Sequence, residues 1–231
     1  DGWLAATAVG RRSRYALTRE GAQRFDDAHR RIYARPVELW SGGWDLVFAD
    51  RVPAVQRATL RNELHWAGFG ELGATTFLRP HLGQPWPGVV DGAGRADHVV
   101  LMHATEPGST GAMASAAGDA WNLTELASAY RRFLQHFGTV IDRFRINGEH
   151  DPAQCFVVRT LLIHAYRRVL LRDPLLPVAL LPIDWPGGAA YSLCRDFYRL
   201  THRSAERHLT AVLSTPEETL PAASAAFRSP V

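Results

Sequence analysis

The chain has 231 residues, of which 46% are hydrophobic and 21% are charged, a composition typical of a globular protein that buries a sizeable core. The formal net charge is +3, yet residues 1–35 alone hold eight arginines against four acidic residues, so the basic charge is concentrated there. No run approaches the about 20 apolar residues that span a bilayer, and no secretory leader is recognised, so we expect a cytoplasmic protein with no membrane segment.

The first predicted element is a β-hairpin that leads into a helix. Apolar-rich strands flank a Gly-Arg-Arg turn, and Thr18 is placed to cap a helix over residues 18–33. A basic hairpin followed by a capped helix is typical of the wing of a winged-helix DNA-binding domain, which contacts phosphates. The alternative is a solvated basic turn without a ligand, because short basic runs are common. The residues predicted to contact DNA are Arg11, Arg12, Ser13, Arg14 and Tyr15.

Residues 36–110 predict a separate α+β domain. A strand, an amphipathic helix with a glycine stop, a second strand, a loop rich in Gly and Pro, and a third strand follow one another. This order is most of a ferredoxin-like unit, in which helices cover one sheet face. The segments are 43–48, 52–66, 73–78, 79–94 and 98–103. A stretch rich in Gly, Ser and Ala, residues 108–118, predicts the domain boundary.

Residues 111–209 predict a helical C-terminal domain, so the fold class of the whole chain is α+β. Apolar residues recur at helical spacing over residues 123–144, 152–171 and 188–209. The chain must leave the second of these helices near Pro174 and Pro177, which lack amide donors. Residues 210–231 are rich in Ala, Ser and Pro and are predicted to be disordered.

A basic face is predicted on the second C-terminal helix. Helical spacing places His164, Arg167, Arg168 and Arg172 on one side, with Tyr166 beside them in the sequence. Several guanidinium groups on one face suit a ligand that carries phosphates. The alternative is a solvated or salt-bridged face that answers Asp173 and other acids, as charge stripes usually are.

Patterns that support catalysis are lacking. Ser192 has no nucleophile-elbow pattern, and Cys155 and Cys194 lie in apolar helical patterns without a hydrolase signature. The ten histidines show no helical pairing that predicts a zinc site, and no glycine-rich phosphate loop occurs. We therefore expect no enzyme activity, no metal site and no cofactor. The seven tryptophans are either core anchors or the lining of an aromatic pocket, and the sequence does not separate these two.

Patches along most of the chain, in a fixed order, resemble the PaaX family, the repressors of phenylacetic acid degradation operons. The patches are Asp1-Gly2-Trp3-Leu4, Gly10-Arg11-Arg12-Ser13 with Tyr15 and Leu17, Arg31-Ile32-Tyr33, Trp40-x-Gly-x-Trp44, Trp66-x-Gly68-Phe69-Gly70, Trp121-x-Leu123, Leu162-Ile163-His164-x-Tyr166-Arg167-Arg168 and Asp173-Pro174-Leu175-Leu176-Pro177.

The resemblance implies a homodimeric regulator with a winged helix, a ferredoxin-like middle domain and a helical C-terminal domain. It also implies binding to operator DNA and release by phenylacetyl-coenzyme A. The family's helix-turn-helix precedes the wing, and this sequence starts at the wing. We therefore expect the chain to be the C-terminal portion of a longer repressor-like protein.

Two other functions are alternatives to a regulator. An acyl-coenzyme A-handling enzyme, such as a thioesterase, needs a nucleophile or base beside the arginine face, where only His164 and Tyr166 are near in sequence. A nuclease built on the middle domain needs a metal-binding carboxylate at a strand end, for which Asp45 and Asp50 are the candidates.

Overall fold

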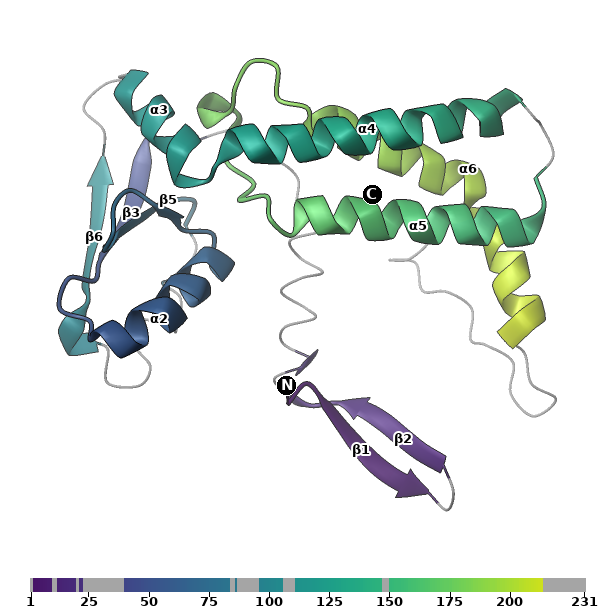
Figure 1. The fold of residues 1–231 in the computed structure, drawn as a ribbon, viewed down its shortest axis with the longest axis horizontal. Helices are drawn as coiled ribbons and strands as arrows, with labels where there is room; N and C mark the ends of the chain where they lie inside the picture. Colours follow the sequence, from purple (N-terminus) through teal and green to yellow (C-terminus); the bar gives the residue numbers. More distant parts are fainter. Residues whose placement is uncertain are drawn as a thin grey trace. The chain divides into compact units, whose positions relative to one another are not determined.

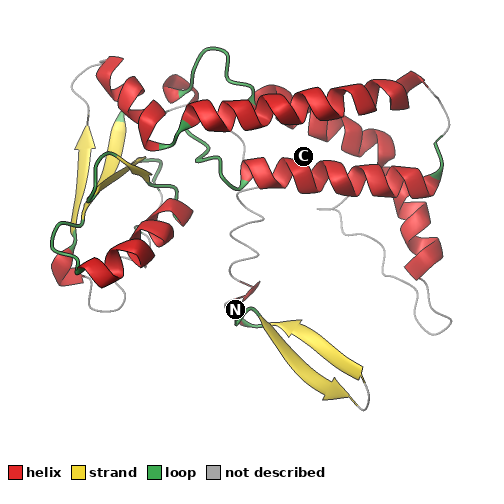
Figure 2. Ribbon diagram, viewed as in Figure 1, coloured by secondary structure: helices red, strands yellow, loops and turns green. Residues whose placement is uncertain are grey.

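The computed structural model describes residues 2–9, 12–19, 21–22, 40–83, 86, 96–105, 111–146 and 150–213. The chain divides into two compact units (Figure 1). Unit 1 comprises Asp1–Arg35, Phe133–Leu171 and Ala190–Val231, and unit 2 comprises Pro36–Arg132 and Arg172–Ala189. Helices and antiparallel strands occur in both units (Figure 2), which confirms the α+β class. None of the helices in the described ranges is long and apolar enough to span a bilayer.

Unit 1 begins with a two-stranded antiparallel hairpin. Strand β1 (Leu4–Val9) pairs with β2 (Arg12–Leu17), with Leu4 opposite Leu17. Thr18 then closes the base of the hairpin: its hydroxyl donates to the Gly2 carbonyl at 2.7 Å and accepts from the Gly21 amide at 3.0 Å. Acceptance from an amide three residues on is an N-cap interaction, so the predicted capping role of Thr18 is confirmed. The predicted helix beyond residue 22 lies outside the described residues.

The helical part of unit 1 is built from the end of α4 (Leu123–Ile146), from α5 (Pro152–Leu170) and from most of α6 (Gly187–Leu213). The Asp151 side chain caps α5 by accepting from the Gln154 amide at 3.2 Å, and proline occupies the first turn. Aromatic rings fill the interior between these helices. The buried residues include Phe133, Phe137, Ile141, Leu162, Tyr166, Phe197 and Ala205.

Unit 2 contains a four-stranded antiparallel sheet. Its strand order is β4 (Gly70–Glu71), β5 (Thr76–Pro80), β3 (Gly43–Phe48) and β6 (Val100–Thr105). Strand β3, which comes first of the four in the chain, therefore lies between β5 and β6 in the sheet. Two 3-10 helices, η1 (Ala96–His98) and η2 (Val178–Leu180), also belong to this unit. The finer description of residues 36–110 as a ferredoxin-like unit stays a prediction.

Helix α2 (Ala54–Trp66) covers one face of this sheet. Its buried Leu60 and Leu64 pack in one cluster with Val47 from β3 and Phe77 from β5. Because side chains alternate along a strand, Asp45 lies on the same sheet face as Val47, two residues further along β3. This placement fixes the position of the site described below.

Tryptophans pack together elsewhere in unit 2. Trp44 is 2% exposed, with its ring centroid 5.0 Å from Trp40 and 6.5 Å from Trp121. Trp121 also donates from Nε1 to the Gly68 carbonyl at 3.2 Å. Gly70 is required here, because a Cβ at that position would lie 2.6 Å from the Trp121 ring. Trp44 is therefore a core anchor.

Several predicted boundaries were wrong. Most of the stretch 108–118, predicted as a domain boundary with no helix, forms α3 (Gly111–Ala120), because alanine is the strongest helix former. Strand β5 starts at Thr76 rather than residue 73, since the Leu72 and Gly73 amides both donate to the Thr76 carbonyl in a turn. Strand β5 also continues through Pro80, so residues 79 and 80, which were expected in a loop, belong to the strand.

Candidate functional site

The hairpin of unit 1 presents polar side chains to solvent. Ser13 is exposed and Tyr15 is 66% exposed, and because they are two residues apart in β2 they lie on one face of the ribbon. Arg12 and Arg14 are β2 positions paired with Val9 and Thr7. Arg11 lies outside the described residues. Two of the five residues predicted to contact DNA are thus shown to be accessible.

A groove of about 750 Å³ lies between α5 and α6 within unit 1. That volume is in the range of sites that hold small molecules and cofactors. The α5 side supplies Arg159, Thr160, Ile163, His164, Arg167 and Arg168, followed by Leu171, and the α6 side supplies Tyr198, Glu206 and Leu209. The groove therefore combines cationic groups with apolar surface.

The charges of the groove are arranged in two levels. Arg159 is only 7% exposed, donates to Glu206 at 2.9 Å and lies 5.6 Å from the centroid of the Tyr198 ring. Its charge is thus neutralised by a carboxylate. Arg167 and Arg168 are exposed, and among the residues that the structure describes neither has an ion-pair partner. Their two guanidinium groups are available to an anionic ligand.

Three of the five residues predicted to bind a ligand line this groove, namely His164, Arg167 and Arg168. The other two do not. Tyr166 is 5% exposed, and its ring lies 5.6 Å from that of Phe133 in the helical core.

Arg172 was expected to share that helix face, but α5 ends at Leu170, two residues before it. The helix cannot continue because Pro174 lacks an amide donor and restricts the residue before it. The Arg172 guanidinium instead donates to Glu125 at 2.6 Å and so lowers the pKa of that carboxyl group. Arg159 was missed, although its spacing of four and eight residues from Ile163 and Arg167 was a visible helical signal.

Neither thiol of the chain is suited to nucleophilic chemistry. Cys155 and Cys194 are both buried and free. Burial raises the pKa of Cys155, and burial raises the pKa of Cys194 to about 12. Because the thiolate is the nucleophile, these groups are inert near neutral pH.

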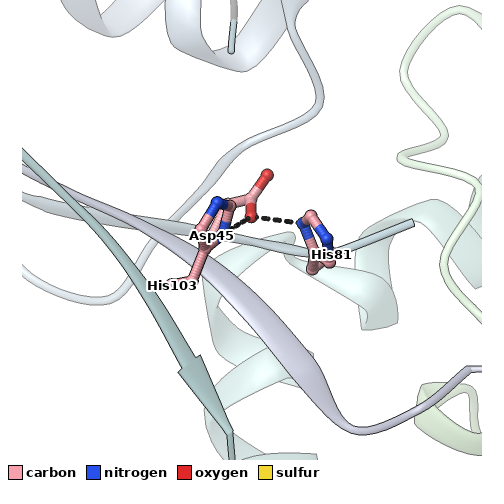
Figure 3. A group of neighbouring side chains, drawn as sticks. All are labelled: Asp45, His81 and His103. Atoms are coloured by element: carbon pink, nitrogen blue, oxygen red, sulfur yellow. Dashed lines mark hydrogen bonds and ion pairs between the residues drawn. The ribbon is translucent and has the colours of Figure 1, made fainter. Parts of the chain in front are cut away.

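A second cluster, in unit 2, joins three strands of the sheet (Figure 3). Asp45 on β3 lies directly opposite Arg79 on β5 and directly opposite His103 on β6, and His81 follows β5. The Nδ1 atoms of His81 and His103 each lie 2.7 Å from Asp45 Oδ1, and Arg79 donates from Nε to Asp45 Oδ2 at 3.0 Å. We call Asp45, His81 and His103 the Asp-His-His cluster.

The histidine pattern examined in the sequence was helical, whereas this cluster is made by sheet register. Asp45 and His103 are directly opposed on β3 and β6, and His81 lies two residues after Arg79, which is directly opposed to Asp45. These partners are known only once the register of the strands is known. The shift of β5 relative to its predicted bounds hid the signal further, because residues 79–94 were all expected in a loop.

Known proteins resemble this chain in sequence and in structure. Residues 121–211 match the model of the PaaX-like protein C-terminal domain. The protein named "Transcriptional repressor PaaX" from Escherichia coli (strain K12) is 34% identical over 205 residues, which are 86% of this chain and 64% of that protein. The solved structure of "Uncharacterized protein Rv0674 from Mycobacterium tuberculosis" is similar with a TM-score of 0.58 at 26% identity, over 89% of this chain and 78% of that one.

Residues 121–211 thus form a PaaX-like C-terminal domain. The match extends far beyond that domain, and the chain belongs to the PaaX family, as the sequence patches predicted. The chain spans less than two thirds, 64%, of the length of the E. coli relative.

Proposed function

We propose that this chain is part of a ligand-responsive transcriptional repressor of phenylacetate and related aromatic catabolic genes. An aryl-acyl-coenzyme A such as phenylacetyl-coenzyme A would release it from operator DNA. The observation that carries this proposal is the similarity, over 86% of the chain, to a protein named as a transcriptional repressor. Because that protein extends beyond the match, repression is proposed for the whole protein rather than for this chain alone.

The basic hairpin is the part proposed to contact DNA. Residues 1–35 carry the excess of arginine, and Ser13 and Tyr15 are exposed on the hairpin. Guanidinium and hydroxyl groups of this kind bind phosphate oxygens, which fixes the position of a protein on the duplex without reading its sequence. Base reading is assigned to a recognition helix of the complete winged helix.

The groove between α5 and α6 is the proposed effector site. Coenzyme A carries phosphates, which suit the exposed guanidinium groups of Arg167 and Arg168, with His164 beside them. Ile163, Leu171 and Leu209 supply apolar surface for the aromatic acyl group. The size of the groove, about 750 Å³, is adequate for part of such a ligand, with the remainder in solvent.

The proposed mechanism is a shift between two conformations of a homodimer. An acyl-coenzyme A that binds one conformation more tightly raises its population. If the spacing of the two wings in that conformation does not match the operator half-sites, DNA affinity falls. The direct test is to titrate operator binding of the longer protein, with its DNA-reading helices, against phenylacetyl-coenzyme A. Unchanged affinity would remove the effector from the proposal.

Replacing both Arg167 and Arg168 with alanine is expected to weaken phenylacetyl-coenzyme A binding by at least about 10-fold. Hydrogen bonds to charged groups are worth about 1.5–3 kcal/mol, and 1.4 kcal/mol is tenfold in affinity. Calorimetric titration of the ligand into each variant measures the change. The matched control is Arg172→Ala, because Arg172 pairs with Glu125 outside the groove and should leave affinity unchanged. An equal loss in the control would place the ligand elsewhere.

Replacing Arg11 and Arg12 with alanine is expected to weaken DNA binding to a similar degree on operator and unrelated sequences. Each lost phosphate contact should also reduce the slope of log affinity against log salt by about 1. The measurement is fluorescence anisotropy at several salt concentrations with the longer protein. Arg143→Ala/Arg145→Ala is the matched double control, because both arginines are exposed in the last turn of α4. A loss confined to the operator sequence would contradict a phosphate-contacting role.

For a thioesterase the groove offers a base candidate, His164, but no activated nucleophile among its described lining residues. Neither cysteine lines it, and both thiols are held protonated by burial. The Thr160 hydroxyl, which does line it, donates to the Phe156 carbonyl of its own helix. Regulation is therefore the function that we propose.

A further inference from the structure

We propose that the Asp-His-His cluster of unit 2 binds one divalent transition-metal ion through Asp45, His81 and His103. This site is separate from the groove and from the hairpin, and the proposal does not depend on the regulatory function. The inference rests on the donor set, on how the sheet holds it, and on its access to solvent.

The donor set is one that transition metals prefer. Two imidazole nitrogens and one carboxylate oxygen, each from a different side chain, lie within 4.8 Å of one another. In the described part of the chain, no other three His, Cys, Asp or Glu side chains meet this distance. Imidazole and carboxylate together bind zinc and the neighbouring divalent ions, with water completing the coordination. Each neutral imidazole offers its Nδ1 lone pair when its proton resides on Nε2.

The sheet fixes the carboxylate firmly. Asp45 is 0% exposed on the central strand, and its Oδ2 accepts from Arg79 at 3.0 Å, so that Oδ1 is directed to the two imidazoles. Arg79 is itself held, because its guanidinium lies 4.7 Å from the centroid of the Phe69 ring and donates to the Ala67 carbonyl at 3.4 Å. A metal-ligating carboxylate oriented by a hydrogen bond to its second oxygen is the usual arrangement around bound metals.

The imidazoles provide access. The His81 and His103 side chains are 40% and 58% exposed, whereas the Asp45 side chain is 1% exposed. The centroids of the two imidazole rings are 4.6 Å apart, and the centroid of the Trp86 ring lies 5.1 Å from that of His103. The imidazoles can therefore be reached from solvent, and their Nδ1 atoms lie beside a buried, preoriented oxygen. Figure 3 shows both rings directed at the carboxylate.

Calorimetric titration of Zn²⁺ into the chelator-treated chain tests the proposal. One equivalent is expected to bind, and His81→Gln and His103→Gln are each expected to weaken binding by at least about 10-fold, the smallest loss seen when even an indirect partner of a metal is removed. Both side chains are substantially exposed, so these changes should leave the fold intact, which circular dichroism checks. His98→Gln is the matched control, because His98 is exposed in η1 directly before β6 and outside the cluster.

Two further readouts make the result decisive. Co²⁺ should give visible ligand-field absorption with the unaltered chain and lose it in the His81→Gln/His103→Gln variant. Zn²⁺ should raise the unfolding temperature of the unaltered chain, because a ligand that binds only the folded state stabilises it, and should not do so in that variant. Absence of Zn²⁺ binding, or equal affinity and an equal temperature shift in the double variant, would overturn the proposal.

Discussion

Replacement of Arg79 with methionine is expected to lower the free energy of unfolding by about 3–5 kcal/mol, the cost of leaving one member of a buried ion pair without its partner. Asp45 is fully buried and Arg79 is 7% exposed, so Oδ2 of the remaining carboxylate loses its donor in a buried position, while Oδ1 keeps its contacts with the two histidines. Methionine keeps much of the length of arginine and its contact with Phe69. The loss therefore comes from the charge rather than from a cavity.

Tryptophan fluorescence during urea unfolding is a suitable measurement, because six of the seven tryptophans lie in unit 2 and only Trp3 lies in unit 1. Arg131→Met is the matched control: Arg131 pairs with Asp184 in the same unit, but the two side chains are 52% and 70% exposed. Exposed pairs contribute about 0–1 kcal/mol. Equal losses in the two variants would show that the Asp45 pair is no different from a surface pair.

The double replacement Asp45→Leu/Arg79→Met separates charge from packing. Apolar residues of similar volume often replace a buried ion pair without loss of stability. We expect the double variant to recover most of the stability that Arg79→Met loses. If it is instead as unstable as the sum of both single variants, packing around the pair rather than the unpaired charge is responsible.

Phe197→Ala is expected to have an effect of the same order in unit 1, about 3–5 kcal/mol, as for other fully buried aromatic residues. Phe197 is 0% exposed, and its ring meets that of Phe144 edge to face with centroids 5.3 Å apart. Truncation removes this contact and leaves a cavity between α4 and α6 that rigid helices cannot close.

Far-ultraviolet circular dichroism follows this loss, because helices form most of the described part of unit 1. The control is Leu200→Ala, one turn along the same helix and 45% exposed, for which a change within about 0.5 kcal/mol is expected. A large loss at Leu200 would indicate that this face of α6 is covered by another part of the molecule or by a second copy.

Where local chemistry decides the structure, the sequence predicted it well. The strand at residues 43–48 has the predicted bounds, since a short apolar run follows Gly42 and Gly43 there. Thr18 caps its helix because the hydroxyl and the amide that it meets are three residues apart. The chain leaves α5 before Pro174, as proline requires. The resemblance to the PaaX family was likewise visible in the sequence, because several short patches occur in the family's order along the chain.

Features that depend on distant partners were not predictable in this way. Arg172 lies close in sequence to Arg167 and Arg168, but its ion-pair partner Glu125 is 47 residues away in the sequence. Tyr166 lies between His164 and Arg167 in the sequence, yet its ring packs against that of Phe133 in the helical core. His81 and His103 meet only because two strands flank Asp45 in one register. Such contacts follow from strand pairing and helix packing, which a single sequence does not specify.

Asp45 Oδ2 accepts from Arg79, whereas Oδ1 contacts the two histidines, so substitutions at these positions are expected to be linked among relatives. A lineage that loses the acid at position 45 keeps a stable sheet only if the arginine at position 79 is exchanged for an apolar residue as well. These two positions are therefore expected to covary across relatives: either both are charged or both are apolar. With a metal site as proposed above, histidines at positions 81 and 103 are expected only beside the charged pair, so that all four residues are inherited together.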